Sequence, residues 1–156
     1  MPEPSINHTM GLEAAEAVSL ARQRFGVTLD YSPESVQRVE EIVSTIYRNL
    51  EKRRHADQYG DPAEDYDPGE EMDNPKLALM MSAYIGEVIR RRWGGAWEVP
   101  AEGRGARLRV KDQDLNPGGL VYRKLTQGGD NLWEYFQRVA AKLDPGSSPT
   151  APSQGS

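Results

Sequence analysis

The stretch LALMMSAYIGEVIRRRWGGAW, residues 77–97, decides the fold. Its apolar side chains recur at steps of three and four, and the face they form is wide enough to predict the most buried helix of the chain. They are Leu77, Met80, Met81, Tyr84, Ile85, Val88 and Ile89. An Asn-Pro pair at 74–75 precedes this helix as a cap signal, and the glycines at 94–95 end it. Gly86 costs about 1 kcal/mol of helix propensity, so we expect it to admit a neighbouring backbone.

Two further helices are expected before this stretch. Residues 11–25 have apolar side chains at helical spacing, and Gly26 is a typical residue to end such a helix. The expected stripe is Leu12, Ala15, Val18, Ala21 and Phe25. Ser32 and Pro33 predict the cap and first position of the next helix, which ends at His55. Its apolar positions are Val36, Val39, Ile42, Val43, Ile46, Tyr47 and Leu50.

After residue 95 the pattern is that of strands. Short segments at 96–99, 106–110 and 120–123 lie between Gly, Pro, Asn and Asp residues. In the second segment Leu108 and Val110 alternate with arginines, which is typical of a half-buried strand. A last helix is expected after a cap at Asp130. Its apolar side chains are Leu132, Trp133, Phe136, Val139, Ala140 and Leu143.

The sequence therefore predicts an α+β fold in which about four helices pack on a small antiparallel sheet of about three strands. We expect residues 1–10 to be a disordered N-terminus, residues 11–143 to form a single domain, and residues 144–156 to be a disordered tail. Residues 57–73 hold eight of the 24 acids and no Lys or Arg, which indicates a solvated acidic loop. The rest of the chain then has 16 acids against 19 bases.

Composition excludes several classes of function. The chain has no Cys, so a disulfide, a thiolate zinc site and a Cys nucleophile are all impossible. A formal net charge of −5 makes a general nucleic-acid binder an unfavoured interpretation. The first residues lack the basic and apolar regions of a signal peptide, and no apolar run is long enough to span a bilayer. We therefore expect a cytoplasmic protein without a membrane partner.

No motif indicates catalysis, a cofactor or a metal. His8 lies in the expected disordered N-terminus, His55 follows three cations at a helix end, and no nucleophile motif accompanies either. The segment from Asp65 to Gly69 begins like a calcium loop, but its Gly falls one place early and Lys76 stands where the last acidic ligand is needed. We predict no catalytic residue, no metal ligand and no cofactor.

The strongest candidate for binding is a basic region with aromatic side chains. Residues 88–111 hold seven Lys or Arg against two Glu, together with Trp93 and Trp97. Arginine beside aromatic rings can bind an anion, a single-stranded nucleic acid or an acidic protein surface. The simpler interpretation is a cationic helix end and the wet face of a strand, and pairing with the acidic loop is a further alternative. The candidate binding residues are Tyr84, Glu87, Arg90, Arg91, Trp93, Trp97, Arg107 and Arg109.

The segments YIGEVIR (84–90) and GGAW (94–97) resemble a family of small bacterial domains of unknown function. The resemblance covers about residues 29–143. It implies an intracellular bacterial accessory protein, of a kind associated with toxin or immunity systems, and it assigns no catalytic residue.

Two functions follow as expectations. The leading one is a non-enzymatic, protein-binding accessory domain, immunity-like or regulatory, whose partner and oligomeric state the sequence does not indicate. The alternative is a small-molecule or nucleotide-binding domain with weak hydrolase activity, which would use Glu87, Tyr84 and Arg90 around the Gly-Gly junction.

Overall fold

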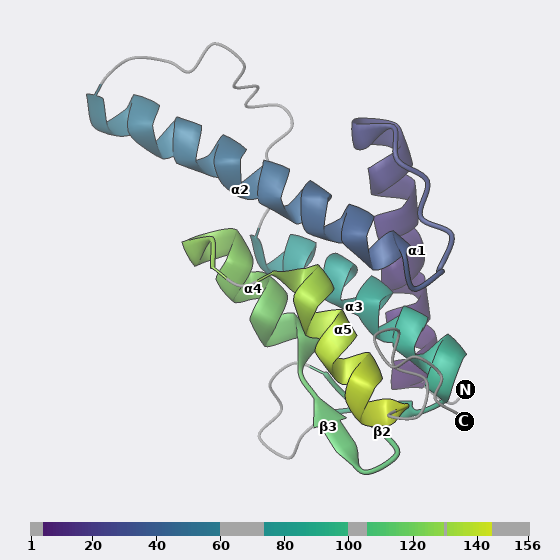
Figure 1. Ribbon diagram of the computed structural model, residues 1–156. Helices are drawn as coiled ribbons and strands as arrows, with labels where there is room; N and C mark the ends of the chain where they lie inside the picture. The colour runs from purple at the N-terminus through teal and green to yellow at the C-terminus, as the bar shows by residue number, and fades with distance from the viewer. Residues whose placement is uncertain (1–4, 60–73, 100–105, 130, 145–156) are drawn as a thin grey trace.

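The computed structural model describes residues 5–59, 74–99, 106–129 and 131–144. In these ranges the chain forms five helices and a three-stranded antiparallel sheet (Figure 1), so the predicted α+β class is confirmed. The elements are α1 (Ile6–Phe25), α2 (Ser35–Tyr59), α3 (Asn74–Trp93), β1 (Ala96–Glu98), β2 (Arg107–Val110), β3 (Gln113–Leu115), α4 (Pro117–Gln127) and α5 (Leu132–Leu143).

Helix α3 is the central element, as its sequence predicts. It contacts α1, α2, α4 and β2, and Figure 1 shows α2 and α4 on either side of it. From Leu77 to Ile89 every residue except Leu79 is buried. A helix surrounded in this way needs apolar side chains on nearly all sides, and the wide apolar face of residues 77–89 provides them.

Helix α1 begins earlier than expected and turns a different face inward. Ser5 caps it by accepting a hydrogen bond from the backbone N–H of His8 at 3.1 Å. The expectation that residues 1–10 are disordered is therefore wrong for residues 5–10. The buried residues are Met10, Ala14, Ala17 and Ala21. Leu12, which was expected on the buried stripe, is 57% exposed, because three alanines let α1 approach α3 closely instead.

Helix α2 follows its predicted pattern and extends beyond it. The hydroxyl of Ser32 accepts a hydrogen bond from the backbone N–H of Ser35 at 3.2 Å, as expected of a cap. The first four predicted apolar positions are buried, and they are Val36, Val39, Ile42 and Val43. The helix continues to Tyr59, so its expected end at His55 is four residues short. The remainder of the expected acidic loop, residues 60–73, lies outside the described residues, as do 145–156 of the expected tail.

The sheet has the strand order β1-β2-β3, and its register pairs Trp97 with Leu108 and Leu108 with Leu115. These three side chains and that of Val110 are buried. The side chains of Arg107 and Arg109 alternate with them on the other face, as the sequence predicts.

The prediction of a third strand at residues 120–123 is wrong. Residues 120–123 belong to α4, and the third strand is instead Gln113–Leu115. The segment that looked like a turn is the start of this helix, because the side-chain oxygen of Asn116 accepts from the backbone N–H of Gly119 at 3.2 Å and Pro117 takes the first position. The same Asn-Pro signal does begin α3, although there the side-chain oxygen of Asn74 is buried without a hydrogen bond.

Helix α5 is capped by Asn131, whose side-chain oxygen accepts from the backbone N–H of Glu134 at 2.9 Å. The predicted cap, Asp130, lies outside the described residues. Four of the expected apolar residues are buried, and they are Leu132, Phe136, Val139 and Leu143.

One carboxylate joins α2 to α4 and α5. Glu40 accepts from the backbone N–H of Leu132 at 2.8 Å and from the hydroxyl of Ser44 at 2.7 Å, and it forms an ion pair with Lys124 at 3.1 Å. The side chains of Glu40 and Lys124 are only 14% and 7% exposed. A buried ion pair needs such additional hydrogen bonds to offset the loss of water, so this group fixes where the two C-terminal helices lie.

Candidate functional site

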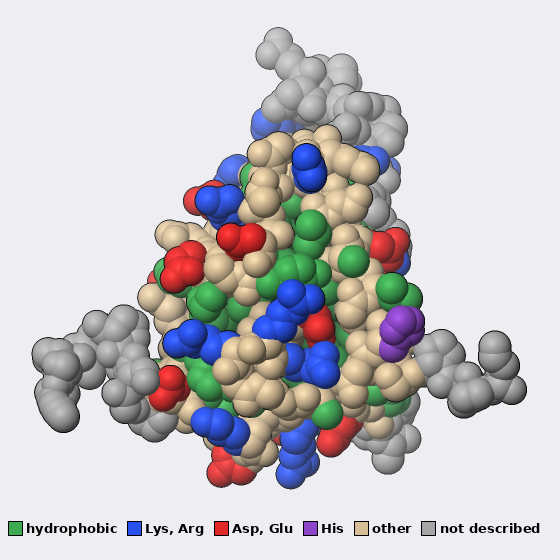
Figure 2. All heavy atoms as spheres, turned by 90° about the vertical axis from the view of Figure 1, so that its right-hand side faces the viewer, with side chains coloured by type: hydrophobic (Ala, Val, Ile, Leu, Met, Phe, Trp, Pro, Cys, Tyr) green, Lys and Arg blue, Asp and Glu red, His purple; other side chains and the backbone are tan. Residues whose placement is uncertain are grey.

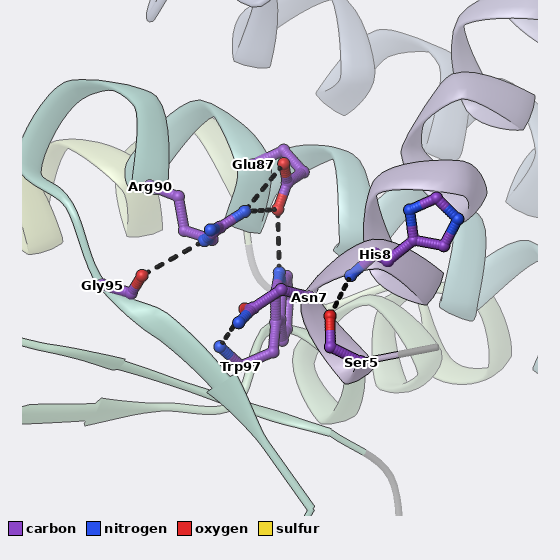
Figure 3. A network of polar contacts seen from close by, with 7 residues as sticks. All are labelled: Ser5, Asn7, His8, Glu87, Arg90, Gly95 and Trp97. Carbon is purple, nitrogen blue, oxygen red and sulfur yellow. Dashed lines mark hydrogen bonds and ion pairs between the residues drawn. The ribbon is translucent and has the colours of Figure 1, made fainter. Parts of the chain in front are cut away.

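Glu87 lies at the centre of a buried polar group (Figure 3). Its Oε2 accepts hydrogen bonds from the indole Nε1 of Trp97 at 2.9 Å and from Nη1 of Arg90, also at 2.9 Å. The same Arg90 nitrogen lies 3.2 Å from Oε1, and Nε of Arg90 donates to the backbone oxygen of Gly95 at 3.2 Å. The carboxylate is thus paired and hydrogen-bonded, which is what a buried charge requires. Figure 3 also shows the imidazole of His8 turned away from it.

Gly86 makes room for the ring of Trp97. A Cβ atom at this position would lie 2.1 Å from Cζ2 and 2.3 Å from Cη2 of the indole. The close neighbour of Gly86 is therefore a side chain, so the expectation that Gly86 admits a neighbouring backbone is wrong. The helical glycine and the Trp of the first strand form one contact, which places β1 against α3.

The first turn of α1 covers the free edge of the sheet at β1. The side-chain oxygen of Asn7 accepts a hydrogen bond from the backbone N–H of Trp97 at 2.8 Å (Figure 3). An open strand edge carries unpaired backbone groups, and Asn7 satisfies one of them. Nothing in the amino-acid sequence indicates this contact, because residues 1–10 have the composition of a disordered end.

Tyr84 is also engaged inside the protein. It is fully buried, and its hydroxyl accepts from the backbone N–H of Tyr31 at 2.7 Å and lies 2.6 Å from the hydroxyl of Ser35. Burial raises the pKa of the Tyr84 phenol, although the hydrogen bond with Ser35 opposes the shift. These contacts join α3 to the start of α2, and they give Tyr84 a structural role.

The ring of Tyr31 contacts an exposed arginine. Its ring lies 4.8 Å from that of Tyr84, and its other neighbour is the guanidinium of Arg91, 3.6 Å from the ring centroid. Burial raises the pKa of the Tyr31 phenol, while the charge of Arg91 lowers it and that of Glu87 raises it. The ring of Tyr31 is half-buried, and Arg91 is exposed. Sequence reasoning missed Tyr31.

Trp93 lies in a row of aromatic rings between α3 and α5. Its ring is 5.9 Å from that of Phe136, which in turn stacks 5.9 Å from that of Trp133. Phe136 is buried, whereas both tryptophans are half-buried. The guanidinium of Arg92 lies 5.4 Å from the ring of Trp93.

Arg107 and Arg109 lie apart from these residues, on the outer face of the sheet. Arg107 forms an exposed ion pair with Asp114 at 3.5 Å, and Arg109 is opposite Asp114 in the strand register. Exposed pairs of this kind contribute little to stability. The simpler interpretation, that the strand arginines occupy the solvent-exposed face of the sheet, fits both residues.

The eight expected binding residues therefore separate into three groups. Tyr84, Glu87, Arg90 and Trp97 hold the interior together, and Arg107 and Arg109 lie on the sheet. The remaining two, Arg91 and Trp93, join Tyr31 and Arg92 at the C-terminal end of α3, and we call these four residues the α3 rim. Figure 2 faces the side on which α3 ends, and it shows Lys and Arg side chains gathered around hydrophobic ones near its centre.

The described ranges contain no candidate metal site and no candidate membrane span. No group of three or more His, Cys, Asp and Glu side chains there could hold a metal ion. None of the described helices is both long and apolar enough to cross a membrane.

Comparisons with models of protein families, with curated proteins and with solved structures gave no match. The resemblance through the YIGEVIR and GGAW segments therefore stays a prediction.

Proposed function

We propose that the protein is a cytoplasmic, non-enzymatic accessory domain, immunity-like or regulatory, that binds a protein partner through the α3 rim. The observation that carries this proposal is the guanidinium of Arg91 at 3.6 Å from the ring of Tyr31. Arginine and aromatic side chains contribute most of the energy of many protein interfaces. An arginine already held against a ring loses less conformational freedom on binding, which favours affinity.

The composition of the rim supports a protein partner. Trp93 is half-buried beside Phe136, and Arg92 lies over its ring. The rim thus combines aromatic rings with arginines, residue types that are enriched at protein interfaces. In the described chain, Arg91 and Arg92 make contacts with aromatic rings but no ion pair. Their charges are therefore available to a partner.

The alternative hydrolase function has less support. It relied on Glu87 as an acid–base group, but the side chain of Glu87 is 7% exposed and its oxygens accept from Arg90 and Trp97. A catalytic carboxyl must come within hydrogen-bond reach of its substrate. A substrate would have to displace the indole of Trp97 first, and that ring is fixed in the core by Gly86.

An affinity capture with matched variants tests the proposal. The immobilised protein is exposed to cytosol from its native host, and the bound proteins are compared with those bound to Arg91→Ala/Arg92→Ala. We expect at least one protein to bind the original chain at low salt and to be lost from the variant. Arg48→Ala/Arg138→Ala is the control, because it removes two exposed arginines from α2 and α5 and changes the net charge equally.

The proposal fails if the original chain captures no protein even at low salt. It fails equally if a captured protein is retained by Arg91→Ala/Arg92→Ala, or is lost to the same degree from the control variant. Circular dichroism of all variants shows whether each is folded before the comparison is made.

A further inference from the structure

The backbone of Tyr31 is in an unusual conformation. Its φ is +64°, in the left-handed region that favours Gly and that bulky side chains rarely adopt. The conformation is maintained from outside, because the backbone N–H of Tyr31 donates to the hydroxyl of the buried Tyr84 at 2.7 Å. A Gly or an Asn would be relaxed here. The Tyr side chain thus brings a conformational cost, and strain of this kind accumulates at functional sites.

The ring of Tyr31 orients Arg91. The guanidinium carbon of Arg91 lies 3.6 Å from the centroid of the ring, and the arginine is exposed. Neighbouring Arg90 is different, because its guanidinium is already engaged by Glu87 and by the backbone oxygen of Gly95. Of these two consecutive arginines, Arg90 is engaged within the protein, whereas Arg91 is exposed, so its planar set of donors is accessible to solvent. Such a set matches the two oxygens of a carboxylate.

We propose that Tyr31 and Arg91 form a receptor for a carboxylate, and that the partner binds through an Asp- or Glu-rich segment. This inference rests on the proposed function and specifies the chemistry of the partner. The guanidinium of Arg91 donates two hydrogen bonds to one carboxylate, and Arg92 attracts a second. The apolar edge of Trp93 packs against the aliphatic part of the same segment.

A carboxylate fits the rim better than the phosphates of a nucleic acid. Nucleic-acid binding requires a track of several cations that each neutralise a phosphate. At the end of α3, Arg90 is paired with Glu87, which leaves a short pair of cations at Arg91 and Arg92.

The test uses a fluorescent oligoglutamate peptide, with an oligothymidylate of equal charge as the competing class of ligand. Fluorescence anisotropy at low salt gives the affinity of each for the full chain. We expect saturable binding of oligoglutamate, weaker binding of oligothymidylate, and an affinity about tenfold lower for Arg91→Ala. Arg48→Ala is the matched control and should bind as the original chain does.

Tyr31→Gly separates a binding role from a structural one. The substitution removes the ring but relaxes the backbone, so we expect the thermal midpoint to stay close to that of the original chain while oligoglutamate affinity falls about tenfold. If Tyr31→Gly does not fold, Arg91→Lys gives the answer, since lysine keeps the charge but lacks the planar donors and should bind about tenfold more weakly.

Four results would overturn the inference. They are no saturable binding of oligoglutamate, tighter binding of oligothymidylate, full affinity in Arg91→Ala or Arg91→Lys, and full affinity in a folded Tyr31→Gly. The proposed function stands or falls separately. Consider a protein that is captured through the α3 rim, is not displaced by oligoglutamate and still binds Tyr31→Gly. Such a protein would support the proposed function and refute the carboxylate receptor.

Discussion

Replacing Gly86 by Ala tests how β1 is attached to α3. In an exposed helix this change would raise the free energy of unfolding by about 1 kcal/mol, since Ala is the better helix former. Here the new methyl group would lie 2.1 Å from Cζ2 of Trp97, far inside contact distance. The ring is buried and its Nε1 donates to Glu87, so it cannot move without breaking that hydrogen bond.

The two costs exceed the gain. Forcing an extra methyl group into a packed core costs about 1–3 kcal/mol. Losing a hydrogen bond to a charged group costs about 1.5–3 kcal/mol. After the helix gain is subtracted, we expect Gly86→Ala to lower the free energy of unfolding by about 1.5–5 kcal/mol. Urea denaturation followed by Trp fluorescence and circular dichroism measures it.

Gly11 provides the matched control. It is also inside a helix, but a Cβ atom there would meet no other atom within 4 Å. Gly11→Ala should therefore raise the free energy of unfolding by about 0.5–1 kcal/mol. A Gly86→Ala variant as stable as the original chain would refute a clash with Trp97. So would an equal loss of unfolding free energy when Gly86→Ala is made in a Trp97→Leu background, where the ring is absent.

Two further changes address the other buried groups. Glu40→Ala should lower the free energy of unfolding in urea by about 3–5 kcal/mol, because it leaves Lys124 in a buried position without this partner. Glu40→Met/Lys124→Met should cost less than Glu40→Ala, and a double variant that costs as much as Glu40→Ala would contradict this. Burial raises the pKa of Tyr135 to about 12, so its neutral form contributes stability that is fully present below about pH 10 and is lost as the pH rises through 12. Measured against pH, Tyr135→Phe should lose less of its unfolding free energy over this interval, and parallel curves would exclude the effect.

Long, strongly periodic segments made the fold predictable. The apolar positions of α3 are large side chains at helical spacing, so pattern and burial agree. In α1 the contrast between an apolar and a polar face is low, because alanines occur on more than one face. Their burial depends on how closely α3 approaches. Residues 116–123 combine turn and cap signals with a short apolar run, and such a run cannot be assigned to strand or helix from its pattern alone. The hydrogen bond of Asn116 decides for the helix.

The candidate site was predictable only in part. Glu87, Arg90 and Trp97 do come together, because two lie one helical turn apart and the third follows the glycines. Tyr31 was missed because it reaches Tyr84 across 53 residues of sequence, and its positive φ is imposed by that contact. Its place directly before the Ser-Pro helix start predicts a hydrophobic staple, which indicates packing and gives no sign of a binding role.

The central claim is that the α3 rim, and neither the Glu87 group nor the outer sheet face, contacts a protein partner. Hydrogen-exchange mass spectrometry of the chain with its captured partner tests this most directly. We predict that the partner slows exchange in peptides containing Tyr31 and in those covering residues 90–93, while peptides covering 107–115 keep their rates. Slower exchange confined to residues 107–115, or unchanged exchange at both parts of the rim, would contradict the account.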